Sequence, residues 1–383
     1  MSRGGWTLII LAAAVAAWFA FGHHLGQTTA KPVERPLKVY APVPKAAPLN
    51  GVAWQITHVY KVVEKARTII PQIANLGADT IMISAARYQE NAVSPVLFND
   101  PEKMPSAEQW REIFAVAHAN NLRVVLMPIV LLSEPRGTEW RGEIKPPNWD
   151  VWFASYEDYI LDMAKLAAAN GVEVMTVGSE LVSTEKYGDR WKRLIASVRK
   201  VFDGKLSYSA NWDHYRHIEF WDDLDYVGMT TYHKLASEAG PALEALIDAW
   251  KPIKDEILTW QATVGKPILF TEVGWCSQEG ASVEAWNYYH KQEATEAGQE
   301  EQRRLYVAFM ETWRDVPEVG GAIWWEWSEA KGGPDDFNYT PRGKPAEKEL
   351  SRWFRQRRDS LARPNAPTTS QTAGERASKT EGS

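Results

Sequence analysis

The chain of 383 residues has a single cysteine, Cys276, and contains no long run of basic residues. One thiol cannot form an internal disulfide or a thiolate metal site by itself, and we interpret it as a packed, non-catalytic thiol. Lys and Arg number 43 against 49 Asp and Glu, giving a net charge of −6. An acidic chain without a basic stripe is a poor partner for nucleic acid. The sequence also shows no cluster of residues with metal-ligand spacing.

Apolar residues make up 45% of the chain and charged residues 24%, which excludes a wholly disordered or fibrous protein. The length fits one large domain with appendages, since a barrel domain alone uses about 250 residues. Tryptophan is abundant, with 19 residues. So many indole rings call for an explanation of what they contact.

Both ends of the chain differ from the middle. Residues 1–22 contain an apolar run at 6–21 behind a short positive start, which predicts a signal peptide or a membrane anchor. Residues 23–50 are rich in proline and predict an extended linker, and residues 356–383 predict a disordered tail. We therefore expect an exported protein, periplasmic or extracellular, whose membrane contact is limited to the N-terminal segment.

Between residues 51 and 355, short apolar runs alternate with longer helical patterns, as expected for strands covered on both faces. The predicted strands are Gly51–Ile56, Asp79–Ala85, Arg123–Leu131, Glu173–Gly178, Leu206–Ala210, Tyr226–Thr231, Pro267–Thr271 and Gly321–Trp325. Eight strand–helix units predict an α/β fold, a single-domain (β/α)8 TIM barrel. A doubly wound open sheet is the alternative, but no glycine-rich phosphate turn follows Trp54. We also expect Pro71 to break or delay the first helix.

Active sites of such barrels lie at the C-terminal strand ends. Glu180 follows the fourth predicted strand and Glu272 the seventh. Two carboxylates facing across a barrel mouth can cleave a glycosidic bond, one as a protonated acid and the other as an ionised nucleophile or base. The alternative for each is structural, because a strand-end Glu also caps helices or pairs with Arg.

Several motifs carry a family resemblance. The segments Val177–Ser183 (VGSELVS) and Leu269–Trp275 (LFTEVGW), with Tyr232 after the sixth strand, resemble a clan A glycoside hydrolase. Trp324–Trp327 (WWEW) and Asp336–Ala346 (DFNYTPRGKPA) make the chain most similar to family 113, the endo-β-1,4-mannanases. The resemblance covers roughly residues 50–355.

The resemblance implies a retaining, double-displacement mechanism without a cofactor. Glu180 would be the general acid/base and Glu272 the nucleophile, with Tyr232 donating a hydrogen bond to Glu272. Trp325 or Trp327 would form the floor under the attacked sugar. Most clan members have Asn directly before the acid/base, where it contacts the sugar 2-hydroxyl, and the Ser179 of this chain leaves the identity of the sugar open.

Indole rings pack against the C–H faces of pyranose sugars, which gives the tryptophans a use. Those on helical stripes, Trp110, Trp191, Trp250 and Trp313, are interpreted as core. The predicted sugar contacts after strands are Trp54, Arg87, Gln89, Asn211, Trp212, His233, Trp275, Trp325 and Trp327. Glu326, between two tryptophans, is expected to point outward to a helix.

Two other functions remain open from the sequence. The aromatic cleft could hold a glycan without cleaving it, as a carbohydrate-binding pseudoenzyme. Alternatively the same two glutamates could transfer a sugar to an acceptor, as a transglycosylase of the cell envelope. The expected partner in every case is a polysaccharide or oligosaccharide, while the sugar, the linkage, endo or exo action and the oligomeric state are not fixed by the sequence.

Overall fold

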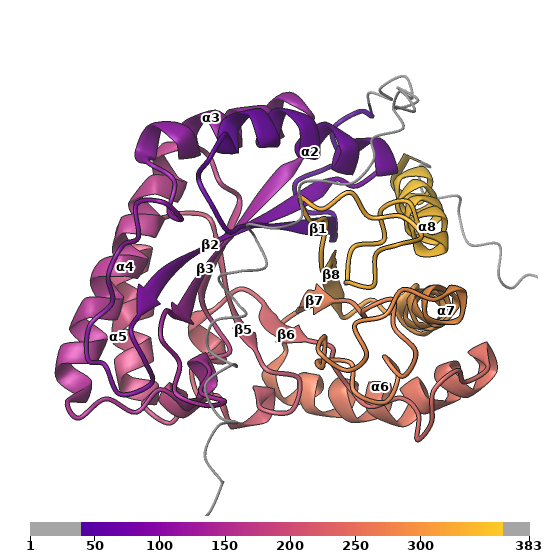
Figure 1. The fold of residues 1–383 in the computed structure, drawn as a ribbon. Helices are drawn as coiled ribbons and strands as arrows, with labels where there is room; N and C mark the ends of the chain where they lie inside the picture. The colour runs from indigo at the N-terminus through magenta and orange to yellow at the C-terminus, as the bar shows by residue number, and fades with distance from the viewer. Residues whose placement is uncertain (1–39, 363–383) are drawn as a thin grey trace, which may run out of the picture. The chain divides into compact units, whose positions relative to one another are not determined.

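The computed structural model describes residues 40–362, which form a closed barrel of eight parallel strands in the order β1 to β8 (Figure 1). The predicted TIM barrel is confirmed. The strands are β1 (Leu49–Ile56), β2 (Thr80–Gln89), β3 (Arg123–Leu132), β4 (Val174–Ser179), β5 (Lys205–Ala210), β6 (Val227–Thr230), β7 (Ile268–Val273) and β8 (Val319–Trp324). Strand β8 pairs with β1 and closes the ring, so neither edge of the sheet is left open.

Helices surround the barrel on its outer side (Figure 1). The α-helices are α2 (Val62–Leu76), α3 (Ala107–Ala119), α4 (Trp149–Ala169), α5 (Gly188–Arg199), α6 (Leu243–Val264), α7 (Glu296–Trp313) and α8 (Pro345–Ala362). Four short 3₁₀ helices lie in the loops: η1 (Arg141–Glu143), η2 (Val182–Thr184), η3 (Tyr215–His217) and η4 (Trp221–Asp223). Between β5 and β6 the last two of these take the place of an α-helix.

Three expected boundaries differ from the structure. Helix α2 continues through Pro71, so the expected break does not occur. Helix α8 extends to Ala362, which makes the beginning of the predicted tail helical, because Leu350, Trp353 and Phe354 are buried on one side of it. Strand β1 begins at Leu49, inside the predicted linker.

The predicted signal peptide or anchor, the first part of the linker and the rest of the tail lie outside the described residues. Within residues 40–362, no helix has the length and apolar character needed to cross a membrane.

Two apolar clusters hold the barrel together. The smaller one fills its interior and consists of Leu49, Ala53, Met82, Ala86, Tyr88, Val125, Met127, Ile129, Val174, Leu269 and Ile323. The larger one lies between the strands and the helices. Successive strand residues point to opposite faces, so on β2 Met82 and Ala86 belong to the interior cluster while Ile81 and Ile83 belong to the outer one. This alternation decides which strand-end residues can face a site in the barrel mouth.

The helical tryptophans Trp110, Trp191, Trp250 and Trp313 are buried in the outer cluster, as predicted. The Trp191 ring stacks on Phe220 with ring centres 5.2 Å apart and meets Tyr208 edge-on at 5.2 Å. Close aromatic packing of this kind stabilises the contact of α5 with the barrel.

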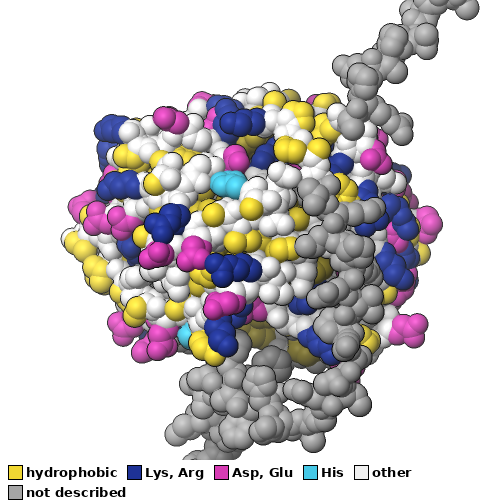
Figure 2. Space-filling view, turned by 90° about the horizontal axis from the view of Figure 1, so that it is seen from above, with side chains coloured by type: hydrophobic (Ala, Val, Ile, Leu, Met, Phe, Trp, Pro, Cys, Tyr) yellow, Lys and Arg dark blue, Asp and Glu magenta, His cyan; other side chains and the backbone are white. Residues whose placement is uncertain are grey.

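The surface is of mixed charge. On the face shown in Figure 2, Lys and Arg side chains of the described residues are interspersed with Asp and Glu. A mixture of both signs favours solubility over a strong field of one sign.

Trp191→Ala is expected to destabilise the fold by about 3–5 kcal/mol, because it leaves a cavity among aromatic rings. Tyr60→Ala, which removes an aromatic ring that is 65% exposed, should change the free energy of unfolding by no more than about 0.5 kcal/mol. Guanidinium denaturation followed by circular dichroism measures both. Equal midpoints for the two variants would contradict the assignment of Trp191 to the core.

Candidate active site

Glu272 lies near the C-terminal end of β7, where the strand is irregular. The pairing of β7 shifts register against β6 between Met229 and Thr230, and against β8 between Phe270 and Val273. An irregularity of this kind changes the direction in which side chains point, and such irregularities are common next to active sites. The Glu272 side chain is consequently buried, with 5% of the residue exposed.

Glu180 directly follows β4, after a register shift between Thr176 and Ser179 in the pairing with β5. Its φ of 52° is in the left-handed region, an uncommon conformation for a residue with a side chain. The backbone N–H of Glu180 donates to the Ser209 carbonyl at 2.8 Å. These features fix Glu180 at the strand end, where 8% of the residue is exposed.

A buried hydroxyl supports the turn after Glu180. The N–H of Leu181 donates to the Tyr208 hydroxyl oxygen at 2.9 Å, and that hydroxyl donates to the Glu185 carboxyl at 2.9 Å. Burial raises the pKa of Glu185 to about 8. Near pH 7 Glu185 is therefore mostly neutral when it accepts the hydrogen bond from Tyr208. The turn after Glu180 is thus supported without another negative charge in the site.

Tyr232 contacts Glu272 as the family resemblance implied. Its hydroxyl donates to the Oε2 atom of Glu272 at 2.7 Å. Burial, and next the charge of Glu272, raise the pKa of Tyr232 well above its usual value. The phenol therefore keeps its proton and remains a donor, and its bond favours the ionised form of Glu272.

Arg141 is a site residue that the sequence reasoning missed. Its guanidinium forms an ion pair with Glu180 at 2.5 Å, with 18% of the Arg141 side chain exposed. Arg141 lies in η1, in the long loop between β3 and α4, and not at the end of a strand. No spacing or strand pattern marks such a residue, so its position could be known only from the fold.

The two glutamates interact electrostatically. Burial first, and then the charge of Glu180, raise the pKa of Glu272 to about 7, while Arg141 and the Tyr232 hydrogen bond act in the opposite direction. Like charges in a poorly hydrated site resist simultaneous ionisation. With a pKa of about 7, the Glu272 carboxyl is only partly ionised at neutral pH.

Glu326, which was expected to point outward to a helix, interacts electrostatically with Glu272. It accepts a hydrogen bond from the backbone of Gln55 on β1, and the charge of Glu272 acts on it. Burial, followed by that charge, raises the pKa of Glu326 to about 8. The Glu326 carboxyl is thus mostly protonated at neutral pH.

Arg87 and Gln89 do not line the barrel mouth. On β2 they alternate with Ala86 and Tyr88 of the interior cluster, so they point to the helices. Arg87 bonds Asp162 of α4 at 3.2 Å. The Oε1 atom of Gln89 accepts a bond from the indole N–H of another α4 residue. The structure corrects the expectation that these two contact sugar.

The same alternation places three tryptophans outside the barrel. Trp54 and Trp275 are fully buried in the outer cluster. Trp327 is also buried there, and its indole N–H donates to Gln72 of α2 at 3.0 Å. These rings are core residues in this structure, which corrects their expected role as sugar contacts.

Of the predicted sugar contacts, Trp325 is the one that packs against the interior cluster, and it is half-buried. It is better placed than Trp327 to form the floor of the mouth. Asn211 is half-buried, and its side chain bonds Asp213 at 2.9 Å. Trp212 and His233 pack against each other with ring centres 5.0 Å apart, and burial lowers the pKa of His233 to about 4, so it is neutral.

Cys276 is buried, and burial raises the pKa of its thiol to about 12, in agreement with a packed, unreactive cysteine.

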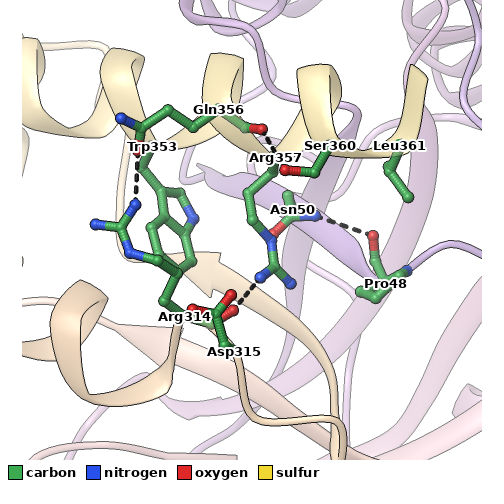
Figure 3. Close-up of a pocket in the computed structure, with 9 residues that line it drawn as sticks. All are labelled: Pro48, Asn50, Arg314, Asp315, Trp353, Gln356, Arg357, Ser360 and Leu361. Atoms are coloured by element: carbon green, nitrogen blue, oxygen red, sulfur yellow. Dashed lines mark hydrogen bonds between the residues drawn. The ribbon is translucent and has the colours of Figure 1, made fainter. Parts of the chain in front are cut away.

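A cavity of about 260 Å³ lies away from the carboxylates (Figure 3). Its walls come from the start of β1, the chain after α7 and the end of α8, at the N-terminal end of the strands. The Trp353 ring forms one wall, and Arg314 is bonded to Gln356 at 2.7 Å. We interpret this contact as structural, because the active sites of this fold lie at the other end of the barrel.

Tyr232→Phe is expected to raise the pKa of Glu272 by about one pH unit, because it removes a hydrogen bond to the charged carboxylate. A pH titration followed by ¹³C NMR of labelled glutamate carboxyls measures this, with the resonance assigned by Glu272→Gln. Tyr339→Phe, whose hydroxyl bonds the Ala285 carbonyl instead, should leave the titration unchanged. A lower or unaltered pKa in Tyr232→Phe would rule out the proposed role of the bond.

Comparisons with known proteins agree with this geometry. The family model described as Glycoside Hydrolase Family 113 matches residues 53–356. The GH113 beta-mannanase AaManA from Alicyclobacillus acidocaldarius, solved in complex with ManMIm, is 27% identical, with 81% of this chain and 98% of that chain covered and a TM-score of 0.72.

More distant structures share the fold. A GH113 beta-1,4-mannanase is 24% identical over 81% of this chain and 99% of that chain, with a TM-score of 0.71. A beta-glucuronidase of Ruminococcus gnavus is 14% identical over 80% of this chain and 49% of that chain, with a TM-score of 0.54. A search of curated proteins returns no match. The family match covers most of the chain, and the protein therefore belongs to glycoside hydrolase family 113 and is a glycoside hydrolase.

Proposed function

We propose that this glycoside hydrolase cleaves β-1,4-linked mannan or manno-oligosaccharides with retention of anomeric configuration, using Glu180 as acid/base and Glu272 as nucleophile. The observation that carries the proposal is the electrostatically coupled pair of buried carboxyls at the ends of β4 and β7. Retaining glycosidases use such a pair, one carboxyl on each side of the bond that is cleaved.

Glu272 is suited to attack the anomeric carbon. Tyr232 bonds its Oε2 atom, which leaves Oε1 as the atom that forms the bond to sugar. The Tyr232 bond also orients the carboxylate before the substrate arrives. Attack by Oε1 breaks the glycosidic bond and gives a covalent glycosyl-enzyme, which water then hydrolyses.

Glu180 must carry a proton when it donates to the leaving oxygen. In the structure Glu180 forms an ion pair with Arg141. In our proposal the bound sugar separates Arg141 from Glu180, and the proton that burial holds on Glu272 then moves to Glu180. This transfer leaves the nucleophile ionised and the acid protonated, as the first step requires.

The choice of mannan rests on the similarity to family 113 structures that are described as mannanases. Trp325 would form the floor below the attacked sugar. The hydroxyl of Ser179, which precedes Glu180, is buried and has no hydrogen-bond partner among the described residues. An exported location, periplasmic or extracellular, remains a proposal from the apolar run at residues 6–21.

Glu180→Gln and Glu272→Gln are each expected to lower hydrolysis of mannan by several orders of magnitude, since each removes a group needed at the reacting bond. The azide products of small-side-chain variants then separate the two roles. Azide should attack the anomeric carbon directly in Glu272→Gly and give an α-glycosyl azide. In Glu180→Ala azide should react with the glycosyl-enzyme instead and give a β-glycosyl azide.

Three outcomes would change the proposal. Full activity in either Gln variant would remove that residue from the chemistry. Oligosaccharide binding without turnover by the natural chain would favour a carbohydrate-binding pseudoenzyme. Longer products in the presence of excess acceptor, with little free sugar released, would favour a transglycosylase that uses the same two carboxyls.

A further inference from the structure

Exposed apolar side chains gather on the side of the barrel where the site lies. Ten large apolar side chains are exposed among the described residues, and eight of them lie in loops that follow strands. Three belong to the loop between β7 and α7: Trp286 is 56% exposed, Tyr288 is 43% exposed and Tyr289 is 65% exposed. Exposed aromatic rings on the same side of the barrel as the reacting carboxyls are candidates for contact with a bound ligand.

A row of tyrosines connects this loop to the nucleophile. Tyr232, which bonds Glu272, has its ring centre 6.2 Å from that of Tyr339. Tyr339 lies 6.4 Å from Tyr288, and Tyr288 lies 4.0 Å from Tyr289. The row therefore extends without a break from the reacting carboxylate to the most exposed ring of the loop.

The outer end of this row also interacts with the ion-pair partner of Glu180. The charge of Arg141, the ion-pair partner of Glu180, acts on the phenol of Tyr288. The two loops that hold Arg141 and Tyr288 follow β3 and β7. A chain bound between these loops would thus reach both catalytic carboxyls.

The loop is held in place by buried polar side chains. The side chain of Gln278, only 1% exposed, donates to the Tyr288 carbonyl at 3.0 Å and accepts from the N–H groups of Lys291 and Gln292 at 2.9 and 2.8 Å. The fully buried carboxylate of Glu301 on α7 accepts from residues 240, 280 and 282. A segment anchored this way presents its aromatic rings in a fixed position, which lowers the entropy cost of binding.

We propose that Tyr288 and Tyr289 form an outer sugar subsite, here called the tyrosine platform, which binds a β-linked oligosaccharide that extends outward from the two catalytic carboxyls. The inference rests on the proposed function and adds a position at which long chains are recognised. The two hydroxyls hydrogen bond to each other at 2.7 Å, which couples the rings and leaves their edges polar. Rings with a polar edge suit a sugar, which has an apolar face and a rim of hydroxyls.

The test compares substrates of different length on the full chain. For Tyr289→Ala, kcat/KM for β-1,4-mannohexaose should fall about tenfold, while kcat/KM for mannotriose should stay within about twofold. Short substrates do not extend to the platform, so they are insensitive to its loss. Tyr289→Phe, which keeps the ring, should retain most of the activity on the hexamer.

Tyr60→Ala is the matched control, because Tyr60 is also 65% exposed but lies in the loop after β1 and outside the tyrosine row. It should not change the ratio of hexamer to trimer kcat/KM. An equal loss at every length, or no loss on the hexamer, for Tyr289→Ala overturns the platform and leaves the proposed function intact.

The proposed function is tested separately. Absence of cleavage of the manno-oligosaccharides by the natural chain overturns the mannanase proposal. Calorimetric titration of Glu272→Gln with β-1,4-linked manno-, gluco- and xylo-hexaose, with and without Tyr289→Ala, then decides the platform. Weaker binding of a hexaose to the double variant than to Glu272→Gln supports the platform. Equal binding to the two variants, or no binding of any of the three hexaoses, overturns the platform.

Discussion

The site depends on the repulsion between two carboxyl groups that the barrel buries in one mouth. Burial and the charge of Glu180 raise the pKa of Glu272 to about 7, so the pair cannot be fully ionised at neutral pH at low cost. Arg141 compensates the charge of Glu180, and Tyr232 that of Glu272. A closed barrel can tolerate the repulsion between these two buried carboxyls, because its strands and helices, and not the site itself, supply the stability of the fold.

Much of the fold could be predicted from the sequence, because parallel strands covered on both faces have a simple pattern. Short apolar runs separated by helical stripes indicated all eight strands. Boundaries were less certain. Pro71 lies within an unbroken helix, where tertiary packing outweighs its local preference, and α8 continues beyond the expected end of the barrel.

The sugar contacts were harder to predict, because a strand-end position does not tell which face a side chain occupies. In the structure Ala86 is an interior residue, and counting from it places Arg87 and Gln89 on the outer face. The sequence shows that side chains alternate but does not show which face Ala86 occupies. The irregular pairing around Glu272 could not be predicted from the sequence either. A register shift changes which residues of a strand face the interior. Arg141 and the tyrosine platform lie on long loops, whose positions no strand pattern fixes.

The anomeric configuration of the first product tests the central claim most directly. ¹H NMR spectra recorded during hydrolysis of a β-1,4-manno-oligosaccharide distinguish the new reducing end before it mutarotates. Direct attack by Glu272, followed by water activated by Glu180, predicts that the β-anomer forms first. Initial release of the α-anomer would mean a single inversion, and it would contradict an arrangement in which these two carboxyls share the roles of nucleophile and acid/base.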